Sequence, residues 1–302
     1  MSVSSYVDIG GIRVGPEYPP MIVAELGINH IGDLACALDM VRLAGLSGAT
    51  AVKFQKRKPK QSVPNSEKSK RRETPWGIMT YLDYKERMEF WDTEYEVIAK
   101  ECLANNLLWF ASVWDVSSVD FIDKYDPPVY KIGSATLTNF PVLERVLVKH
   151  RPIIMSTGMS TMQEIEDAVT FVREAHDRLI LCHSTSIYPC PKSKVNLMFL
   201  NTLAKKWPHL VLGYSGHEEG TGITQAAVAL NASYIERHFT LDNTMWGTDQ
   251  AASLEHLEFA EMAAQCHAVW YAKGDGKKVV YPEELEKMQS LRPEVILAAH
   301  TS

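Results

Sequence analysis

Short apolar runs alternate with amphipathic stretches along most of the chain. Each apolar run is about five to eight residues long and rich in Val, Ile, Leu or aromatic residues, and together they cover 21–26, 51–55, 108–113, 129–134, 152–158, 179–185, 210–216 and 233–240. Near-continuous apolarity indicates strands that are buried on both faces, as in a parallel sheet covered by helices.

The amphipathic stretches predict helices between these strands, at 33–43, 83–105, 117–123, 140–149, 161–175, 195–206, 220–230 and 254–272. One of them opens with Thr161 and Glu164, the spacing of a capping box. Eight strand–helix repeats favour an α/β protein with a closed (β/α)₈ TIM barrel. An open doubly wound sheet normally has fewer strands and a glycine-rich first turn, and 27–30 reads Gly-Ile-Asn-His instead.

Two segments fall outside this repeat. Residues 6–14 predict an N-terminal β-hairpin that turns at Gly10 and Gly11, and we expect it to plug the N-terminal end of the barrel. Residues 57–80 are polar and basic with three prolines, and predict one long irregular connection, either a functional loop or a mobile surface loop. We expect one barrel domain over 1–275 and a C-terminal tail over 276–302 with a short helix at 282–291.

Composition and net charge limit the partners and the cellular compartment that we expect for this protein. The 302 residues carry a net charge of −6, which argues against nucleic acid or an anionic membrane as a partner. An enzyme for anionic substrates must then concentrate positive charge locally. Five scattered cysteines, no signal peptide pattern and no apolar run of about 18 residues predict a cytoplasmic protein with reduced thiols.

Polar residues recur at the C-terminal ends of the predicted strands. In TIM barrels this rim carries the active site. In chain order the residues are Glu25; Lys53 and Gln55; Ser112; Lys131 and Ser134; Ser156; His183, Ser186 and Tyr188; Ser215 and His217; and Glu236, Arg237 and His238. Since a few such residues are expected by chance and all eight strands supply one, we predict a polar site at this rim.

Two lysines lie inside apolar strands, where an unpaired charge is costly. Lys53 and Lys131 therefore either form ion pairs with Glu25 or Glu236, or hold the phosphate and carboxylate of a small polyanion. In the second case the hydroxyls of Ser134, Ser156 and Ser215 would complete its hydrogen bonds.

Two histidines end neighbouring predicted strands. His217 and His238 are placed so that their imidazoles can converge on one divalent cation, with Asp249 and Glu25 nearby. His183 is a weaker third candidate.

These motifs resemble the sialic acid synthases. The resemblance runs from about residue 6 to 265, one motif per strand, through 22–30 (IVAELGINH), 51–55 (AVKFQ), 130–134 (YKIGS), 155–159 (MSTGM), 183–189 (HSTSIYP), 213–217 (GYSGH) and 235–240 (IERHFT).

The resemblance implies a phosphoenolpyruvate-dependent transferase. Its acceptor would be the aldehyde of an open-chain hexosamine, N-acetylmannosamine or its 6-phosphate, and its product a nine-carbon 2-keto-3-deoxy acid plus phosphate. It implies catalytic roles for Glu25, Lys53, Lys131, His217 and His238, with a divalent metal, manganese first and magnesium or cobalt as alternatives, on the two histidines. The implied substrate-binding residues are Gln55, Ser112, Ser134, Thr136, Ser156, Ser186, Tyr188, Ser215, Arg237 and Asp249.

This chain departs from the family pattern in three places. Ala135-Thr136 replaces a Gly-Glu pair whose glutamate lies near the acceptor, Ser186 replaces an Asn, and Gly216 replaces an Asp. Many members are dimers joined by a C-terminal antifreeze-like domain, which supplies an arginine that reads the N-acetyl group. The sequence ends at Ser302, and we expect it to lack that domain. A homodimer is therefore possible but is not predicted by this domain.

The acceptor could then be read by the basic segment instead, through residues such as Arg57, Lys58, Lys60, Arg71 and Arg72. Three alternatives stay open: an octulosonate-type synthase acting on a pentose phosphate, a metal-dependent aldolase on the same barrel, and a non-catalytic sugar-binding homologue.

Overall fold

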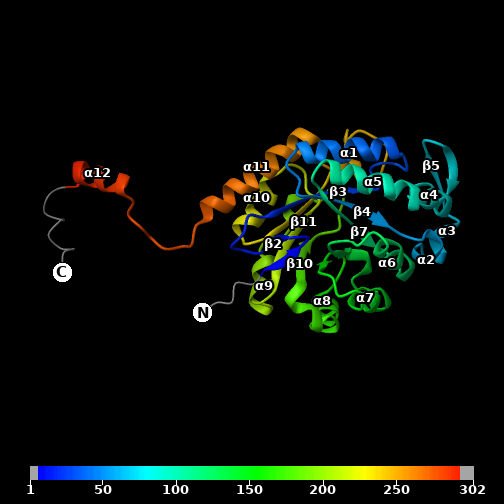
Figure 1. The fold of residues 1–302 in the computed structure, drawn as a ribbon, viewed down its shortest axis with the longest axis horizontal. Coiled ribbons are helices and arrows are strands. Elements are labelled where there is room, and N and C mark those ends of the chain that lie inside the picture. The colour runs from blue at the N-terminus through cyan, green and yellow to red at the C-terminus, as the bar shows by residue number, and fades with distance from the viewer. Residues whose placement is uncertain (1–5, 293–302) are drawn as a thin grey trace. The chain divides into compact units, whose positions relative to one another are not determined.

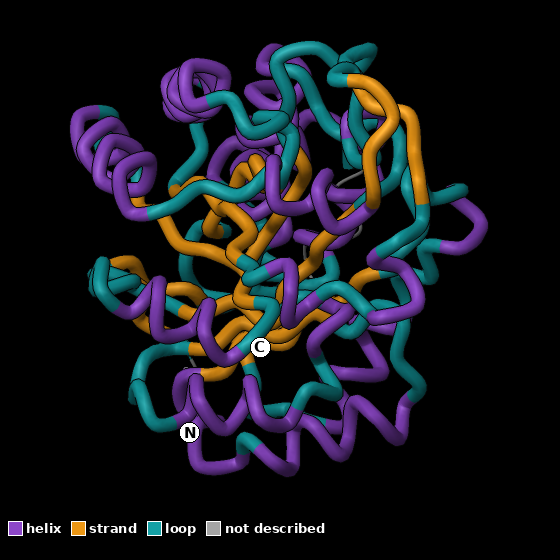
Figure 2. Tube along the Cα trace, turned by 90° about the vertical axis from the view of Figure 1, so that its right-hand side faces the viewer, coloured by secondary structure: helices purple, strands orange, loops and turns teal. Residues whose placement is uncertain are grey.

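The computed structural model describes residues 6–292. The chain divides into two compact units, one that ends at Tyr271 and one that begins at Ala272. The first unit contains the predicted barrel, in which a ring of strands is enclosed by helices (Figures 1 and 2).

Eight parallel strands close this barrel within the described part of the chain. In chain order they are β3 (Met21–Gly27), β4 (Ala51–Lys56), β7 (Leu108–Val113), β8 (Tyr130–Ile132), β9 (Ile153–Ser156), β10 (Leu179–Ser184), β11 (Val211–Gly216) and β12 (Tyr234–His238). Each pairs with the next along the chain, and β12 pairs with β3. The predicted (β/α)₈ fold is therefore confirmed.

The burial of the strands follows their pleat. In β3, Ile22 and Ala24 pack outward in the cluster beneath the helices, while Met21 and Val23 pack inward with residues of other strands. Because side chains alternate between the two faces, the next inward residue is Glu25, at the C-terminal end of the strand. The same alternation brings a polar side chain inward at the end of every strand.

Helices cover the outside of the strands. The main ones are α1 (Leu34–Leu46), α5 (Asp92–Ala104), α6 (Val116–Asp123), α7 (Phe140–Leu147), α8 (Met162–Phe171), α9 (Phe199–Lys206), α10 (Gly222–Ala229) and α11 (His256–Lys273). The predicted capping box is present at α8, where Thr161 and Glu164 exchange side-chain to backbone hydrogen bonds. Short 3₁₀ turns lie at Ser134–Thr136, Arg173–Arg178, Lys192–Lys194 and Gln250–Ala252.

The predicted N-terminal hairpin is present, as β1 (Val7–Ile9) and β2 (Ile12–Val14). Gly10 and Gly11 form its turn with φ of 59° and 87°, left-handed values that glycine adopts at low cost. Val7, Ile9 and Val14 are buried in one cluster with the inward residues of the barrel strands. The hairpin therefore closes the end of the barrel opposite the polar rim.

Residues 57–80 are not the irregular connection that their composition predicts. They form two short helices, α2 (Pro59–Ser62) and α3 (Asn65–Lys68), and a hairpin of β5 (Arg71–Thr74) and β6 (Gly77–Thr80). Helix α4 (Tyr81–Arg87) follows directly and packs on these elements through its buried Tyr84 and Met88. We call residues 57–91 the β4–α5 excursion; it lies at the right-hand end of Figure 1.

The single helix predicted at 83–105 is also wrong. The chain breaks between α4 and α5, where Glu89 turns inward to pair with Lys56 and Arg57 at 3.2 and 3.1 Å. Helix α5 then begins at Asp92, and the backbone N–H of its N-cap residue Trp91 donates to the Glu94 carboxylate at 2.9 Å. Buried ion pairs therefore override a continuous helical pattern.

The second unit contains α12 (Pro282–Leu291), as predicted. Across residues 6–292, no helix is both long enough and apolar enough to cross a membrane.

Candidate functional site

A cavity of about 510 Å³, which we call the first cavity, opens at the C-terminal ends of the strands. All eight strands contribute to its wall, with Glu25, Lys53, Gln55, Ser112, Lys131, Ser156, Ser184, Ser215, Glu236 and His238. Ser134, Thr136, Tyr188 and His217 line it from the residues that follow the strands. The predicted concentration of polar residues at this rim is therefore present.

Two lysines and two glutamates form the floor of the first cavity. Lys131 Nζ lies 2.7 Å from Glu236 Oε2, and Lys53 Nζ lies 2.8 Å from Glu25 Oε2 and 3.5 Å from Glu236 Oε1. Ser112 accepts from Lys53 at 2.6 Å, which completes the contacts of that ammonium group. Both lysines thus form the ion pairs with glutamate that were one of the two predictions for them. Both also face the cavity.

The two glutamates of the floor differ in their pKa. Burial raises the pKa of Glu236, but Lys131 and Lys53 outweigh burial and hold it below its ordinary value, so Glu236 stays ionised. Burial, with the charge of Glu236, raises the pKa of Glu25 to about 7 against the opposing pull of Lys53. Glu25 can therefore gain or lose a proton near neutral pH, as an acid or base in a cavity must.

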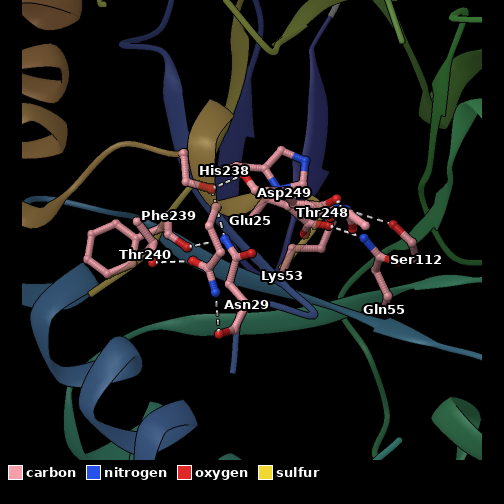
Figure 3. Close-up of polar contacts among 12 residues, drawn as sticks. Glu25, Asn29, Lys53, Gln55, Ser112, His238, Phe239, Thr240, Thr248 and Asp249 are labelled. Atoms are coloured by element: carbon pink, nitrogen blue, oxygen red, sulfur yellow. Dashed lines mark hydrogen bonds and ion pairs between the residues drawn. The ribbon is translucent and has the colours of Figure 1, made fainter. Parts of the chain in front are cut away.

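Gln55 connects this floor to the β4–α5 excursion. Its Nε2 donates to Glu25 Oε1 at 3.0 Å, and its Oε1 accepts from the guanidinium of Arg57. Figure 3 shows Gln55 beside Glu25, Lys53 and Ser112. An amide thus fixed at both ends holds one orientation.

The two predicted metal-binding histidines lie together on the wall. The ring centroids of His217 and His238 are 5.3 Å apart, and the ring of Tyr188 lies 4.1 Å from the first and 5.7 Å from the second. His217 Nδ1 bonds the carbonyl of Thr185 at 2.8 Å, so its Nε2 is left to accept. His238 Nδ1 is buried and 4.0 Å from Asp249 Oδ2, with no hydrogen bond to any described residue (Figure 3).

Both imidazoles are held neutral. Burial and the neighbouring His238 lower the pKa of His217 to about 3, and burial also lowers the pKa of His238. Neutral imidazole is the form that binds metal ions.

A second cavity, of about 750 Å³, adjoins the first and shares Gln55, Trp114, Met159 and Tyr188 with it. The β4–α5 excursion supplies much of its wall, including Arg57, Ser62, Tyr81 and Lys85, and the segment after β12 supplies Thr248 and Asp249.

Thirteen of the fifteen predicted site residues line one or both cavities; these are Glu25, Lys53, Gln55, Ser112, Lys131, Ser134, Thr136, Ser156, Tyr188, Ser215, His217, His238 and Asp249. Ser186 does not: its side chain faces a separate hollow beside Gly158 and Phe199. Ser184, two residues earlier, takes the place at the first cavity that we predicted for Ser186.

Arg237 is the clearest error. It points to the outside of the barrel wall, is 0% exposed, and pairs with Glu218 at 3.2 Å. It also donates to the carbonyl of Gly220 and to Thr224 at 2.8 Å each. A guanidinium with these partners stabilises the barrel wall and does not face substrate. His183 likewise bonds the carbonyl of Val195 at 2.6 Å and lies outside both cavities.

Sequence reasoning named Glu236 at the rim without assigning it a role in the site, and it missed two further residues that line the cavities, Trp114 and Lys85. Glu236 lies on the inner face of β12, two residues before His238, and the strand period alone identifies it. Trp114 follows β7 directly and lines both cavities. Lys85 belongs to a helix, and no pattern in the chain marks it.

With this geometry in place, the chain can be compared with known proteins. The NeuB family profile matches residues 40–278. Human N-acetylneuraminate-9-phosphate synthase is 35% identical over 294 residues, which cover 95% of this chain and 80% of that protein. The N,N'-diacetyllegionaminic acid synthase of Campylobacter jejuni is 33% identical over 288 residues, with 91% of this chain and 84% of that protein covered.

A solved structure of a sialic acid synthetase is also similar to this chain in fold. The N-acetylneuraminic acid (sialic acid) synthetase of Leptospira borgpetersenii serovar Hardjo-bovis, in complex with citrate, matches with a TM-score of 0.84 and 30% identity, over 96% of this chain and 99% of that one.

The fold and the comparisons together define a TIM-barrel sugar-acid synthase, a transferase, and two lysines lie at the floor of its first cavity. The chain belongs to the NeuB family, and the resemblance to sialic acid synthases predicted from its motifs is confirmed. Its reaction is a condensation of phosphoenolpyruvate with an aldose that forms a nonulosonic acid.

Proposed function

We propose that this enzyme condenses phosphoenolpyruvate with the open-chain aldehyde of a hexosamine of the N-acetylmannosamine type. The product is a nine-carbon 2-keto-3-deoxy acid, and inorganic phosphate leaves. One observation carries the proposal: a cavity with two lysines and two neutral imidazoles adjoins a second cavity large enough for a sugar. The relatives named above as synthases of such acids support it.

Phosphoenolpyruvate belongs in the first cavity. Lys53 and Lys131 would offset the loss of solvation of its phosphate and carboxylate, and the hydroxyls of Ser134 and Ser156 would donate to its oxygens. The hydroxyl of Ser215 donates to Glu236 at 3.0 Å and would have to turn from it to donate to the substrate. Ser156 Oγ is buried without a hydrogen-bond partner in residues 6–292, so a substrate oxygen would satisfy it. Orientation by fixed groups is the main contribution of such a floor.

The acceptor aldehyde belongs where the cavities meet, between Tyr188 and Gln55. There C3 of the enol attacks the aldehyde carbon, and a carbon–carbon bond forms as the π electrons of the aldehyde move to its oxygen, which takes up a proton and becomes a hydroxyl. Positive charge develops at C2. Water then adds to C2 and passes a proton to a carboxylate; Glu25, with its pKa of about 7, is suited to accept it. The tetrahedral intermediate collapses to the ketone as its C2–O bond to phosphate breaks.

His217 and His238 fit a divalent metal, for which we propose manganese, with magnesium or cobalt as alternatives. Both rings are neutral, and the buried Nδ1 of His238 lacks a hydrogen bond within the described residues. Residues 6–292 contain no cluster of three or more His, Cys, Asp or Glu side chains arranged for a metal, so water or substrate oxygens would complete its coordination. When bound, the ion would supply Lewis acidity to the aldehyde oxygen.

The family glutamate replaced by Thr136 has no direct substitute. Thr136 lines the first cavity, and among the described residues the cavity walls carry carboxylates only at Glu25, Glu236 and Asp249. Asp249, in the second cavity, is placed to accept hydrogen bonds from sugar hydroxyls. We propose that acceptor recognition rests on Asp249, Gln55 and Tyr188.

Phosphate release from phosphoenolpyruvate with a panel of aldoses tests this function. We expect release that depends on added hexosamine and on divalent metal, with phosphoenolpyruvate alone as the control. Release with pentose 5-phosphates and not with hexosamines would support an octulosonate-type synthase. Aldol chemistry without phosphoenolpyruvate would support an aldolase, and sugar binding without turnover under all three metals would support a binding homologue.

A further inference from the structure

Lys85 is a buried amine that contacts no counter-charge among residues 6–292. It comes from α4, lines the second cavity and is 6% exposed. Within the described residues, no hydrogen-bond acceptor and no carboxylate contacts its ammonium group; the rings of Tyr81 and Tyr84 flank it at 5.3 and 4.9 Å. Ring faces offset only part of the solvation that a buried ammonium loses.

The charges around Lys85 do not favour its protonated form. Burial, then Arg57 and Arg72, lower the pKa of Lys85 to about 7, and the opposing effect of Asp249 and Glu89 is smaller. The first cavity differs, because there each lysine contacts a glutamate. A buried amine that opens to a cavity and contacts no carboxylate is suited to bind an anion that enters from outside, because the anion favours its protonated form.

Arg57 lies on the wall of the same cavity. Its Nε faces Glu89 at 3.1 Å, its Nη2 donates to Gln55, and its guanidinium stacks 4.1 Å from the ring of Trp114. Its remaining amino group, Nη1, has no acceptor among residues 6–292. Arg57 is therefore oriented by its neighbours while it keeps donors for a ligand.

The wall of the second cavity therefore carries two cations, Arg57 and Lys85, and one carboxylate, Asp249. Tyr81 also lines this cavity and adds one hydroxyl donor, whereas the hydroxyls of Ser62 and Thr248 already donate to the Lys58 carbonyl and the Asp249 carboxylate. A carboxylate ligand brings one charge and two oxygens, whereas a phosphate monoester brings nearly two charges and three terminal oxygens. The donor set matches the phosphate monoester better.

We propose that the acceptor sugar carries a phosphate monoester at the end away from its aldehyde, and that Lys85 with Arg57 binds this phosphate. The inference rests on the proposed function for the orientation of the sugar. With the aldehyde beside His217 and Tyr188, the far end of a hexose lies in the second cavity, which the β4–α5 excursion walls. The excursion thus sets the acceptor class.

The test compares N-acetylmannosamine with its 6-phosphate as acceptors for wild type, Lys85→Met, Lys85→Arg and Arg87→Gln. Arg87 is the matched control, since it lies on the same helix, is exposed and lines neither cavity. The readout is kcat/KM from phosphate release; both acceptors release one phosphate, from phosphoenolpyruvate, so they are compared on one scale.

In wild type we expect the 6-phosphate to exceed the neutral sugar in kcat/KM by roughly tenfold or more. Lys85→Met should lower kcat/KM for the 6-phosphate about 10- to 100-fold and that for the neutral sugar by less than about threefold, as expected for one charge-assisted contact. Lys85→Arg should retain much of the preference, and Arg87→Gln should retain all of it.

A wild-type preference for the neutral sugar, or an equal loss with both acceptors in Lys85→Met, would overturn the phosphate subsite. A preference for the matching uronic acid would assign the subsite to a carboxylate instead. If no sugar releases phosphate, the proposed function fails, and calorimetry with N-acetylmannosamine 6-phosphate then decides the subsite alone: binding weakened in Lys85→Met supports it, and absent or unchanged binding overturns it.

Discussion

Lys131 Nζ lies 2.7 Å from Glu236 Oε2, and the other oxygen of the same carboxylate lies 3.5 Å from Lys53. One buried carboxylate therefore spaces the two ammonium groups of the cavity floor. Because Ser215 and Tyr234 also donate to it, Glu236 is held in place from below. The floor is thus assembled before any substrate binds, which lowers the cost of orienting one.

Replacing Lys131 with Met should weaken phosphoenolpyruvate binding more than acceptor binding. We expect the KM for phosphoenolpyruvate to rise roughly tenfold or more and the acceptor KM to change less than about threefold, since one charge-assisted contact is lost. Steady-state kinetics with each substrate varied in turn measures both. The reverse order would reassign Lys131 to the acceptor.

The same change weakens the fold, because Glu236 then keeps only the more distant of its two lysines, Lys53. Breaking a buried pair costs on the order of 3–5 kcal/mol. The double variant Lys131→Met/Glu236→Gln should recover part of that stability in thermal unfolding without recovering the KM. Recovery of both would mean that Lys131 acts only through Glu236.

Arg237 should matter for stability and not for substrate binding. Arg237→Met leaves the buried Glu218 without its cation and should cost on the order of 3–5 kcal/mol of unfolding free energy. The double variant Arg237→Met/Glu218→Gln should regain part of this loss, as seen by thermal unfolding. A raised KM in folded Arg237→Met, with its stability unchanged, would restore Arg237 to the substrate site.

The barrel could be predicted because every strand follows the same pattern, in which side chains alternate between the inner and the outer face. The inward cluster contains Ile180 and Cys182 of β10, the outward cluster contains Leu179 and Leu181, and this period of two produces an apolar run that reads as a buried strand. Applied further, the same period places Ser184 inward. Our prediction of Ser186 followed the family position and not the pleat, and the prediction of Arg237 beside Glu236 made the same error.

The second cavity could not be predicted, because its wall depends on contacts between distant segments. Glu89 breaks the helical pattern only because Lys56 and Arg57 reach it from the end of β4. Lys85 reads as a surface lysine of an amphipathic helix until α2, α3 and the β5–β6 hairpin cover it. No local sequence period encodes such burial.

Replacement of either histidine should remove metal binding. His217→Ala and His238→Ala each delete one of two imidazoles, so we expect Mn²⁺ affinity to fall about 100-fold or more, with turnover lost to a similar degree. Calorimetric titration with Mn²⁺ measures this without reference to activity. His209→Ala is the control, since that ring is exposed and lines neither cavity. Equal Mn²⁺ affinity in all three variants and wild type would remove the metal assignment.

Lys85 should make the fold less stable as the pH falls. Its pKa in the folded chain, about 7, lies below the 10.5 of an exposed lysine, so between these values the unfolded chain holds a proton that the folded chain lacks. The free energy of unfolding is therefore unaffected by Lys85 above about pH 10.5. As the pH falls toward 7 it decreases, by an amount on the order of a few kcal/mol.

Lys85→Met removes that loss, so it should melt roughly 5 °C or more above wild type at pH 6, and the two should converge as the pH rises through 9. Thermal unfolding across this range tests it, with Arg87→Gln expected to follow wild type at every pH. The comparison separates a lysine that serves ligand binding from one that serves folding. If Lys85 serves ligand binding, its replacement raises the stability of the fold and lowers kcat/KM for a phosphorylated acceptor. A variant less stable than wild type at pH 6 would show that the ammonium supports folding, and the argument for an anion subsite would lose its basis.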